Sequence, residues 1–278
     1  MKKFLSLMAT ALVVAFSGCA GTTPAAEAGV KIEKEAATYK IASYTSIEDA
    51  KAKLASAGFE VVGTYKSFDQ GTTVLFTNSA MKAAADKPMR GLAAVGRLLV
   101  DDERKQISIA NPVYFGKAFM QKEYNHAAAS AVLTSLEKAF GPLKDSTDKW
   151  EFDGLASYHF MVGMPYYEEM IVVGEGSTAD LVAKAKKAKG AVGVVQLSAD
   201  RYVAFMDLDR RTKKFVDKIG TQNAALLPWA VLIEDGKAKA LSAKYFIAIS
   251  YPLLTMSEFM TIATVPGAIE NDLKKSFK

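Results

Sequence analysis

The chain has 278 residues, of which 50% are hydrophobic and 23% are charged. This balance is typical of a globular protein and excludes wholesale disorder. Lysine and arginine number 35 against 30 aspartates and glutamates, a net charge of +5 that is too small and too scattered to indicate nucleic-acid binding.

The N-terminus has the pattern of a secretion signal over residues 1–18. Two lysines precede an apolar run over residues 4–16, which is too short to cross a bilayer of about 30 Å as a helix. Phe16-Ser17-Gly18-Cys19 then resembles the lipobox of bacterial lipoproteins, in which the cysteine is acylated and becomes the new N-terminus. We therefore predict lipidation at Cys19, with an ordinary secretory signal as the alternative.

The residues after this cysteine support an anchored protein of the bacterial cell envelope. Cys19 is the only cysteine, so no internal disulfide can form in the oxidising compartment that secretion implies. Because Ala20 rather than aspartate follows it, the resemblance to enterobacterial lipoproteins implies an outer-membrane anchor facing the periplasm. Residues 19–38 contain almost no large apolar side chain, which predicts a flexible tether.

A first folded unit is predicted over residues 39–142. Thr45-Ser46-Ile47-Glu48 is a capping-box pattern, and it begins a helical repeat that Gly58 ends. Two apolar runs joined by a charged reversal, over residues 98–102 and 106–111, predict a β-hairpin. The other expected elements are strands over residues 39–44, 59–65 and 72–77 and a helix over residues 129–140.

A linker over residues 143–165 is expected to lead to a second unit over residues 166–278. Ser177 is predicted to cap a lysine-rich helix. The segment over residues 231–237 ends in Asp235-Gly236-Lys237 and is followed by a second run over residues 239–243, so Asp235-Gly236 is a strong hairpin signal. The other expected elements are strands over residues 169–173, 191–197 and 202–208 and a closing helix marked by Ile269, Leu273 and Phe277.

The two units follow the same order of elements. Ser46 corresponds to Ser177 with an offset of 177 − 46 = 131 residues, and Ser108 corresponds to Ser242 with an offset of 242 − 108 = 134 residues. An offset that drifts slowly is what duplication with small insertions leaves. We therefore predict an α+β fold of two tandem repeats, each a small helix-on-sheet domain.

The two hairpins also resemble a known family. The segment Leu227-Pro228-Trp229 with the strand and Asp235-Gly236-Lys237 that follow it resembles the core motif of DUF302, a domain of unknown function. Residues 97–102 and 107–112 look like the same motif, including the closing Asn111-Pro112. The resemblance implies small domains that pair, so the two repeats are expected to pack as an intrachain pseudo-dimer. It implies no established activity.

The acidic pairs and a histidine beside methionines are candidate sites of chemistry. Asp101-Asp102 and Glu234-Asp235 could act as paired carboxylates or bind calcium, but their hairpin positions favour solvated turns. His159 beside Met161 and Met164 could bind Cu(I), whereas the same residues also suit a packed connection between the units. No motif of catalysis or cofactor binding is present, and no cofactor is predicted.

Aromatic segments that follow both hairpins are the remaining candidate. We expect them either to line a groove that binds a small apolar ligand or to form the seam of the pseudo-dimer; they comprise Tyr114, Phe115, Phe119, Tyr251 and Phe259. The sequence thus favours an envelope lipoprotein that binds such a ligand or an envelope protein partner. The alternatives are copper binding and an enzyme using residues such as Tyr166, Glu168 and His159.

Overall fold

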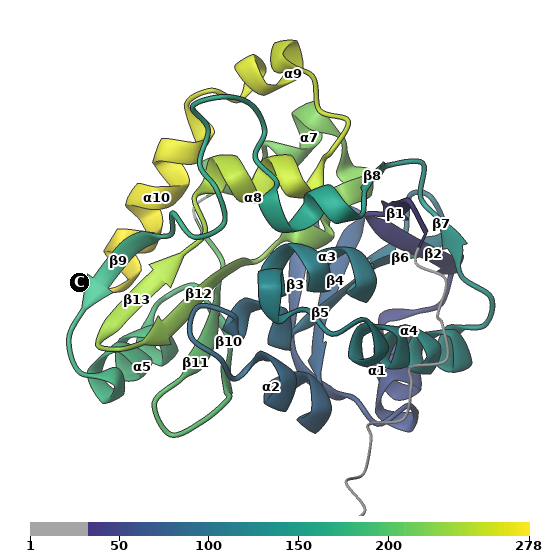
Figure 1. Ribbon diagram of the computed structural model, residues 1–278, viewed down its shortest axis with the longest axis horizontal. Coiled ribbons are helices and arrows are strands. Elements are labelled where there is room, and N and C mark those ends of the chain that lie inside the picture. The colour runs from purple at the N-terminus through teal and green to yellow at the C-terminus, as the bar shows by residue number, and fades with distance from the viewer. Residues whose placement is uncertain (1–32, 209) are drawn as a thin grey trace, which may run out of the picture. The chain divides into compact units, whose positions relative to one another are not determined.

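The computed structural model describes residues 33–208 and 210–278 (Figure 1). The predicted signal peptide, Cys19 and most of the predicted tether lie outside the described residues. The fold is α+β, as predicted, and its main sheets are antiparallel.

The strands are β1 (Glu35–Ala37), β2 (Tyr39–Ser43), β3 (Glu60–Phe68), β4 (Gly71–Thr77), β5 (Gly96–Asp101), β6 (Gln106–Ala110), β7 (Lys144–Asp145), β8 (Lys149–Glu151), β9 (Ile171–Glu175), β10 (Ala191–Gln196), β11 (Tyr202–Met206), β12 (Trp229–Glu234) and β13 (Lys237–Ala240). The α-helices are α1 (Ile47–Ser56), α2 (Ser79–Ala85), α3 (Pro112–Met120), α4 (His126–Phe140), α5 (Thr178–Lys187), α6 (Arg210–Lys213), α7 (Val216–Ile219), α8 (Ala243–Ser250), α9 (Met256–Thr261) and α10 (Val265–Ser276). The short 3₁₀ helices are η1 (Gly91–Ala94), η2 (Gln121–Glu123), η3 (Asp153–Ser157) and η4 (Thr221–Leu226).

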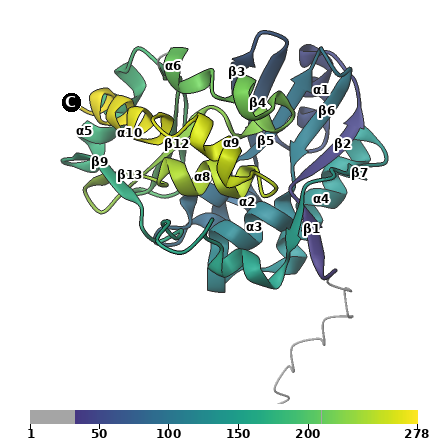
Figure 2. The same cartoon turned by 90° about the horizontal axis from the view of Figure 1, so that it is seen from above.

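Two large sheets organise the described chain. One has six strands in the order β3-β4-β5-β6-β2-β7, and the other has five in the order β10-β11-β12-β13-β9. In Figure 2, β9 and β13 lie on the left and β2 and β7 on the right, with α8 between them. β1 and β8 form a separate two-stranded ribbon.

Local sequence signals place most of these elements correctly. Both predicted hairpins are confirmed, as β5 with β6 and β12 with β13. Asp235 and Gly236 have φ angles of 50° and 69°, the positive values that a two-residue type I′ turn requires. The predicted cap at Thr45 is wrong by one residue: Ser46 caps α1 by accepting from the Asp49 amide. Ser177 caps α5 as predicted.

Two segments predicted to be connections belong to the fold. The tether was expected to extend through residue 38, yet β1 pairs with β8, and Ala36 and Ala37 are buried. The linker expected over residues 143–165 contains β7, β8 and η3. These strands are too short to show an alternating pattern, and the pairing of β1 with β8 joins residues more than one hundred positions apart.

Most of the core is shared by both halves of the described chain. The larger core cluster includes Leu99 and Tyr114 from the first half together with Phe205, Leu232 and Tyr245 from the second. A smaller cluster lies between the six-stranded sheet and helices α1 and α4. The shared cluster makes the two sheets parts of one packed structure, so any groove between them is largely closed by side chains.

The edge strands of the two sheets lie against each other. A Cβ atom added at Gly63 in β3 would lie 2.7 Å from the Val192 carbonyl oxygen, and one added at Gly193 in β10 would lie 2.9 Å from the Val62 carbonyl oxygen. Each strand has a register irregularity at its valine, because Val62 and Val192 are skipped in the pairing with β4 and β11. The contact is therefore reciprocal and needs glycine on both sides.

Candidate ligand-binding cavity

A cavity of about 430 Å³ lies among α2, η1, α3 and α4, with α8 and η4 of the second half closing its inner end. In Figure 1, α2 and α4 lie in the lower part of the view with α3 above them. Its walls are mostly apolar and include Met81, Leu92, Phe115, Phe119, Val132 and Phe246. A volume of this size is in the range of sites for small organic molecules.

Alanine side chains create the mouth of the cavity. Ala80 and Ala84 on α2 and Ala128 and Ala131 on α4 all line the cavity, and all four are exposed to solvent. Because alanine ends at Cβ, the two helices leave space where larger residues would have filled it. The helix α2 was not predicted, since its seven residues are too few to show a helical repeat.

An ion pair lies beside this mouth. Lys87 Nζ is 3.1 Å from Glu123 Oε2, and both side chains are partly exposed. The hydrogen bond from Lys87 lowers the pKa of the Glu123 carboxyl, so the pair stays charged at neutral pH. The charges at the mouth of the cavity are therefore already balanced.

The inner end of the cavity contains a buried arginine. Arg97, at the start of β5, is only 9% exposed and donates a hydrogen bond to the Leu226 carbonyl oxygen. Its guanidinium carbon lies 5.2 Å from the centre of the Phe246 ring and 5.6 Å from that of the Phe205 ring. Burial lowers the pKa of Arg97 to about 10, which leaves the side chain protonated at neutral pH.

Two hydroxyl groups lie at the same end. The Tyr39 hydroxyl is 3.2 Å from the Asn223 carbonyl oxygen and 3.5 Å from the Ser250 carbonyl oxygen. Burial raises the pKa of Tyr39, so this hydroxyl remains protonated. Ser250 is fully buried, and within the described chain its Oγ makes no hydrogen bond of good geometry. Both residues line the cavity.

The predicted aromatic residues are divided between this cavity and the packing of the two halves. Phe115 and Phe119 line the cavity. Tyr114 is buried and donates to the Ile249 carbonyl oxygen at 2.9 Å, so it packs the first half of the chain against the second. Tyr251 donates to the Gly220 carbonyl oxygen at 2.7 Å, and Phe259 packs 5.3 Å from the Phe160 ring. The five residues therefore do not share one groove.

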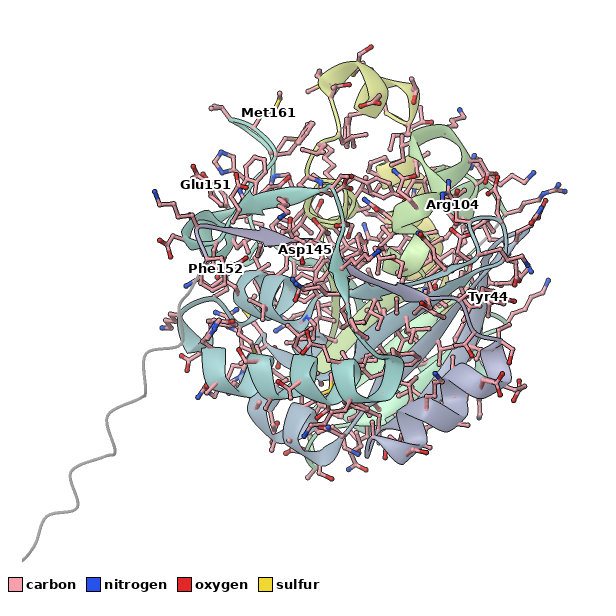
Figure 3. All side chains as sticks on the ribbon, turned by 90° about the vertical axis from the view of Figure 1, so that its right-hand side faces the viewer. Tyr44, Arg104, Asp145, Glu151, Phe152 and Met161 are labelled. Atoms are coloured by element: carbon pink, nitrogen blue, oxygen red, sulfur yellow. The ribbon has the colours of Figure 1, made fainter. Side chains whose placement is uncertain are left out.

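The candidate copper ligands lie on a surface loop. Figure 3 shows Met161 on a loop that projects from the fold, and its side chain is 40% exposed. Met164 packs against the core, and the His159 ring contacts the Tyr166 ring at 4.5 Å. Over residues 33–208 and 210–278, no three His, Cys, Asp or Glu side chains gather as a metal site.

One residue of each acidic pair is buried, although both pairs were expected to lie in solvated turns. Asp101 is completely buried and accepts from the Arg104 amide and guanidinium, both at 2.9 Å. Glu234 is 1% exposed and accepts from Arg201 Nε at 2.8 Å and from the Met89 amide at 3.0 Å. The expectation was wrong for Asp101 because its own turn folds back and places Arg104 on the buried carboxylate, and it was wrong for Glu234 because Arg201 and Met89 lie far away in the sequence.

The residues considered for an enzyme do not line the cavity. Tyr166 is 44% exposed, and Glu168 is an exposed residue that lies 3.7 Å from the buried Arg90. Arg97 lines the cavity but is not among the residues predicted for a site, although it interrupts the apolar run of residues 95–100. A charged residue at the start of a buried strand was the one signal available for it.

Comparisons with known proteins leave the family open. None of the helices in the described part of the chain is both long and apolar enough to span a membrane. No family model, no curated protein and no solved structure matches the chain, so the resemblance of its hairpins to DUF302 stays a prediction.

Proposed function

We propose that this protein binds a small, largely apolar molecule in the cavity between α2, α3 and α4. The observation that carries the proposal is the cavity itself, whose apolar walls reach from an exposed mouth to a buried end. Ligand sites commonly combine such walls with a few polar groups at fixed positions. Arg97, Tyr39 and Ser250 supply these groups.

Blocking the mouth tests this proposal. In Ala128→Trp, an indole ring enters the gap between α4 and α2, and we expect the affinity for the fluorescent apolar probe N-phenyl-1-naphthylamine to fall at least roughly tenfold. Ala127→Trp is the matched control, because Ala127 is exposed on the same helix but is not part of the lining. Equal probe titration curves for both variants and the wild type would place the binding elsewhere.

We further propose that the described chain is a tandem duplication packed as an intrachain pseudo-dimer. The strand order supports it, since β3-β4-β5-β6-β2 and β10-β11-β12-β13-β9 run through their halves in the same sequence of elements. Tyr114-Phe115 in α3 and Tyr245-Phe246 in α8 support it too, with an offset of 245 − 114 = 131 residues. The reciprocal contact of β3 with β10 has the form of a two-fold interface, in which the same surface is used twice.

The predicted lipidation gives the proposed location. We propose that acylated Cys19 anchors the protein in the outer membrane of the bacterial envelope, facing the periplasm, with the lipobox pattern as support. Serine offers no thiol for acylation, so Cys19→Ser is expected to shift the protein from the membrane fraction to the soluble fraction and to abolish labelling by radioactive palmitate. A variant that stays in the membrane fraction would contradict the anchor.

A further inference from the structure

We infer that the ligand of the cavity carries an acid group, and that Arg97 binds this group at the buried end. The inference rests on the proposed function and names the class of ligand: a single-headed amphiphile, such as a medium-chain carboxylate, whose apolar tail lies among the side chains of α2, α3 and α4.

The first argument is the unbalanced charge of Arg97. Removing a cation from water is strongly unfavourable unless an opposite charge and hydrogen bonds compensate for it. The groups that contact Arg97 are a carbonyl oxygen and two aromatic rings, all of which are neutral. Among the described residues, no aspartate or glutamate lies within 4.0 Å of its guanidinium nitrogens.

Two other arginines of the fold show what compensation looks like in this protein. Arg104 lies 2.9 Å from Asp101, and Arg201 lies 2.8 Å from Glu234. Each of them has a carboxylate at hydrogen-bond distance, although both side chains are more exposed to solvent than Arg97. Arg97 has no such carboxylate, but it lines the cavity. An anionic ligand in the cavity would supply the missing negative charge.

The second argument is the pair of hydroxyl groups beside Arg97. Ser250 Oγ is buried, and the Tyr39 side chain is its polar neighbour, so an acid oxygen at this end of the cavity can accept from either hydroxyl. The Tyr39 hydroxyl also lies 3.5 Å from the backbone carbonyl oxygen of Ser250. Acid oxygens can accept from the guanidinium group and from a hydroxyl at once, and charge-assisted hydrogen bonds of this kind are the strong ones.

Comparing an acid with its alcohol tests the inference. Decanoate and 1-decanol have the same chain length, and at about pH 8 the acid is fully ionised. We expect the wild type, measured by displacement of N-phenyl-1-naphthylamine, to bind decanoate roughly tenfold or more tighter than decanol. Arg97→Met is expected to lose this preference while still binding decanol, because methionine keeps an apolar stem without the charge. Lys82→Met is the control, since Lys82 is a cation on α2 that is not part of the lining.

The outcomes separate the inference from the proposed function. If the wild type binds decanol as tightly as decanoate, ligand binding in the cavity is supported and the inference of an acid group is overturned. This result does not depend on whether Arg97→Met folds. A preference that survives in Arg97→Met but disappears in Lys87→Met would place the acid at the mouth and also overturn it. If neither compound nor the probe binds the wild type, the proposed function itself fails.

Discussion

Replacing Gly63 and Gly193 together by alanine is expected to destabilise the fold by roughly 2 to 5 kcal/mol, through overpacking at two sites. The new Cβ atoms would lie 2.7 Å from the Val192 oxygen and 2.9 Å from the Val62 oxygen. These oxygens belong to the backbone, so a change of rotamer cannot relieve the contact. The strands β3 and β10 would have to move apart, and the packing shared by both halves would loosen.

Urea unfolding of the described unit, followed by far-ultraviolet circular dichroism, measures this change in the free energy of unfolding. Gly267→Ala is the matched control, because an added Cβ at this position in α10 meets no atom within 4 Å. The control is expected to stabilise the fold by about 0.5 to 1 kcal/mol, since alanine restricts the unfolded chain and favours helix. Equal stability of the double variant and the wild type would show that β3 and β10 are not in contact.

Glu234→Gln is expected to lower the free energy of unfolding by about 2 to 3 kcal/mol. Glu234 is 1% exposed, and its carboxylate lies 2.8 Å from Arg201 Nε and 3.2 Å from Lys239 Nζ. The amide removes the negative charge that these two cations share, while the Asp86 carboxylate remains for Arg201 alone. The link from Glu234 to the Met89 amide, which joins β12 to the segment after α2, weakens at the same time.

The neighbouring acid provides the control for this substitution. Asp235→Asn makes the same chemical change one residue later, at an exposed turn position with a φ angle of 50° that asparagine also tolerates. We expect a change below about 0.5 kcal/mol. Similar midpoints of thermal unfolding for the two variants would show that the buried carboxylate is no more important than the solvated one.

Elements with a clear local pattern were predictable from the sequence. The hairpins of β5 with β6 and β12 with β13 have branched apolar runs and turn formers within a few residues of each other. The cap of α1 was placed one residue early, because Thr45 and Ser46 have similar hydroxyl groups and only the backbone angles decide between them. The ribbon of β1 and β8 was missed, since no local signal marks a three-residue strand whose partner is far away in the chain.

The candidate site depends on contacts that no local pattern contains. The aromatic segments drew attention to Phe115 and Phe119, which do line the cavity, and to Tyr251 and Phe259, which do not. Whether the charge of Arg97 is balanced depends on Leu226, Phe246 and Ser250, more than 120 positions later. A sequence shows that a cation is present, but the absence of a carboxylate around it is a property of the folded chain.

The contact between β3 and β10 also bears on how this protein avoids association with other chains. The outer strand of a sheet presents unpaired backbone groups to which a strand of another molecule can bind, and such exposure promotes aggregation. Here β3 and β10 are the outer strands of their sheets, and each one lies against the other with a register irregularity at the point of contact. Each half thus covers one outer strand of the other half, so separating the halves would expose two strand edges at once.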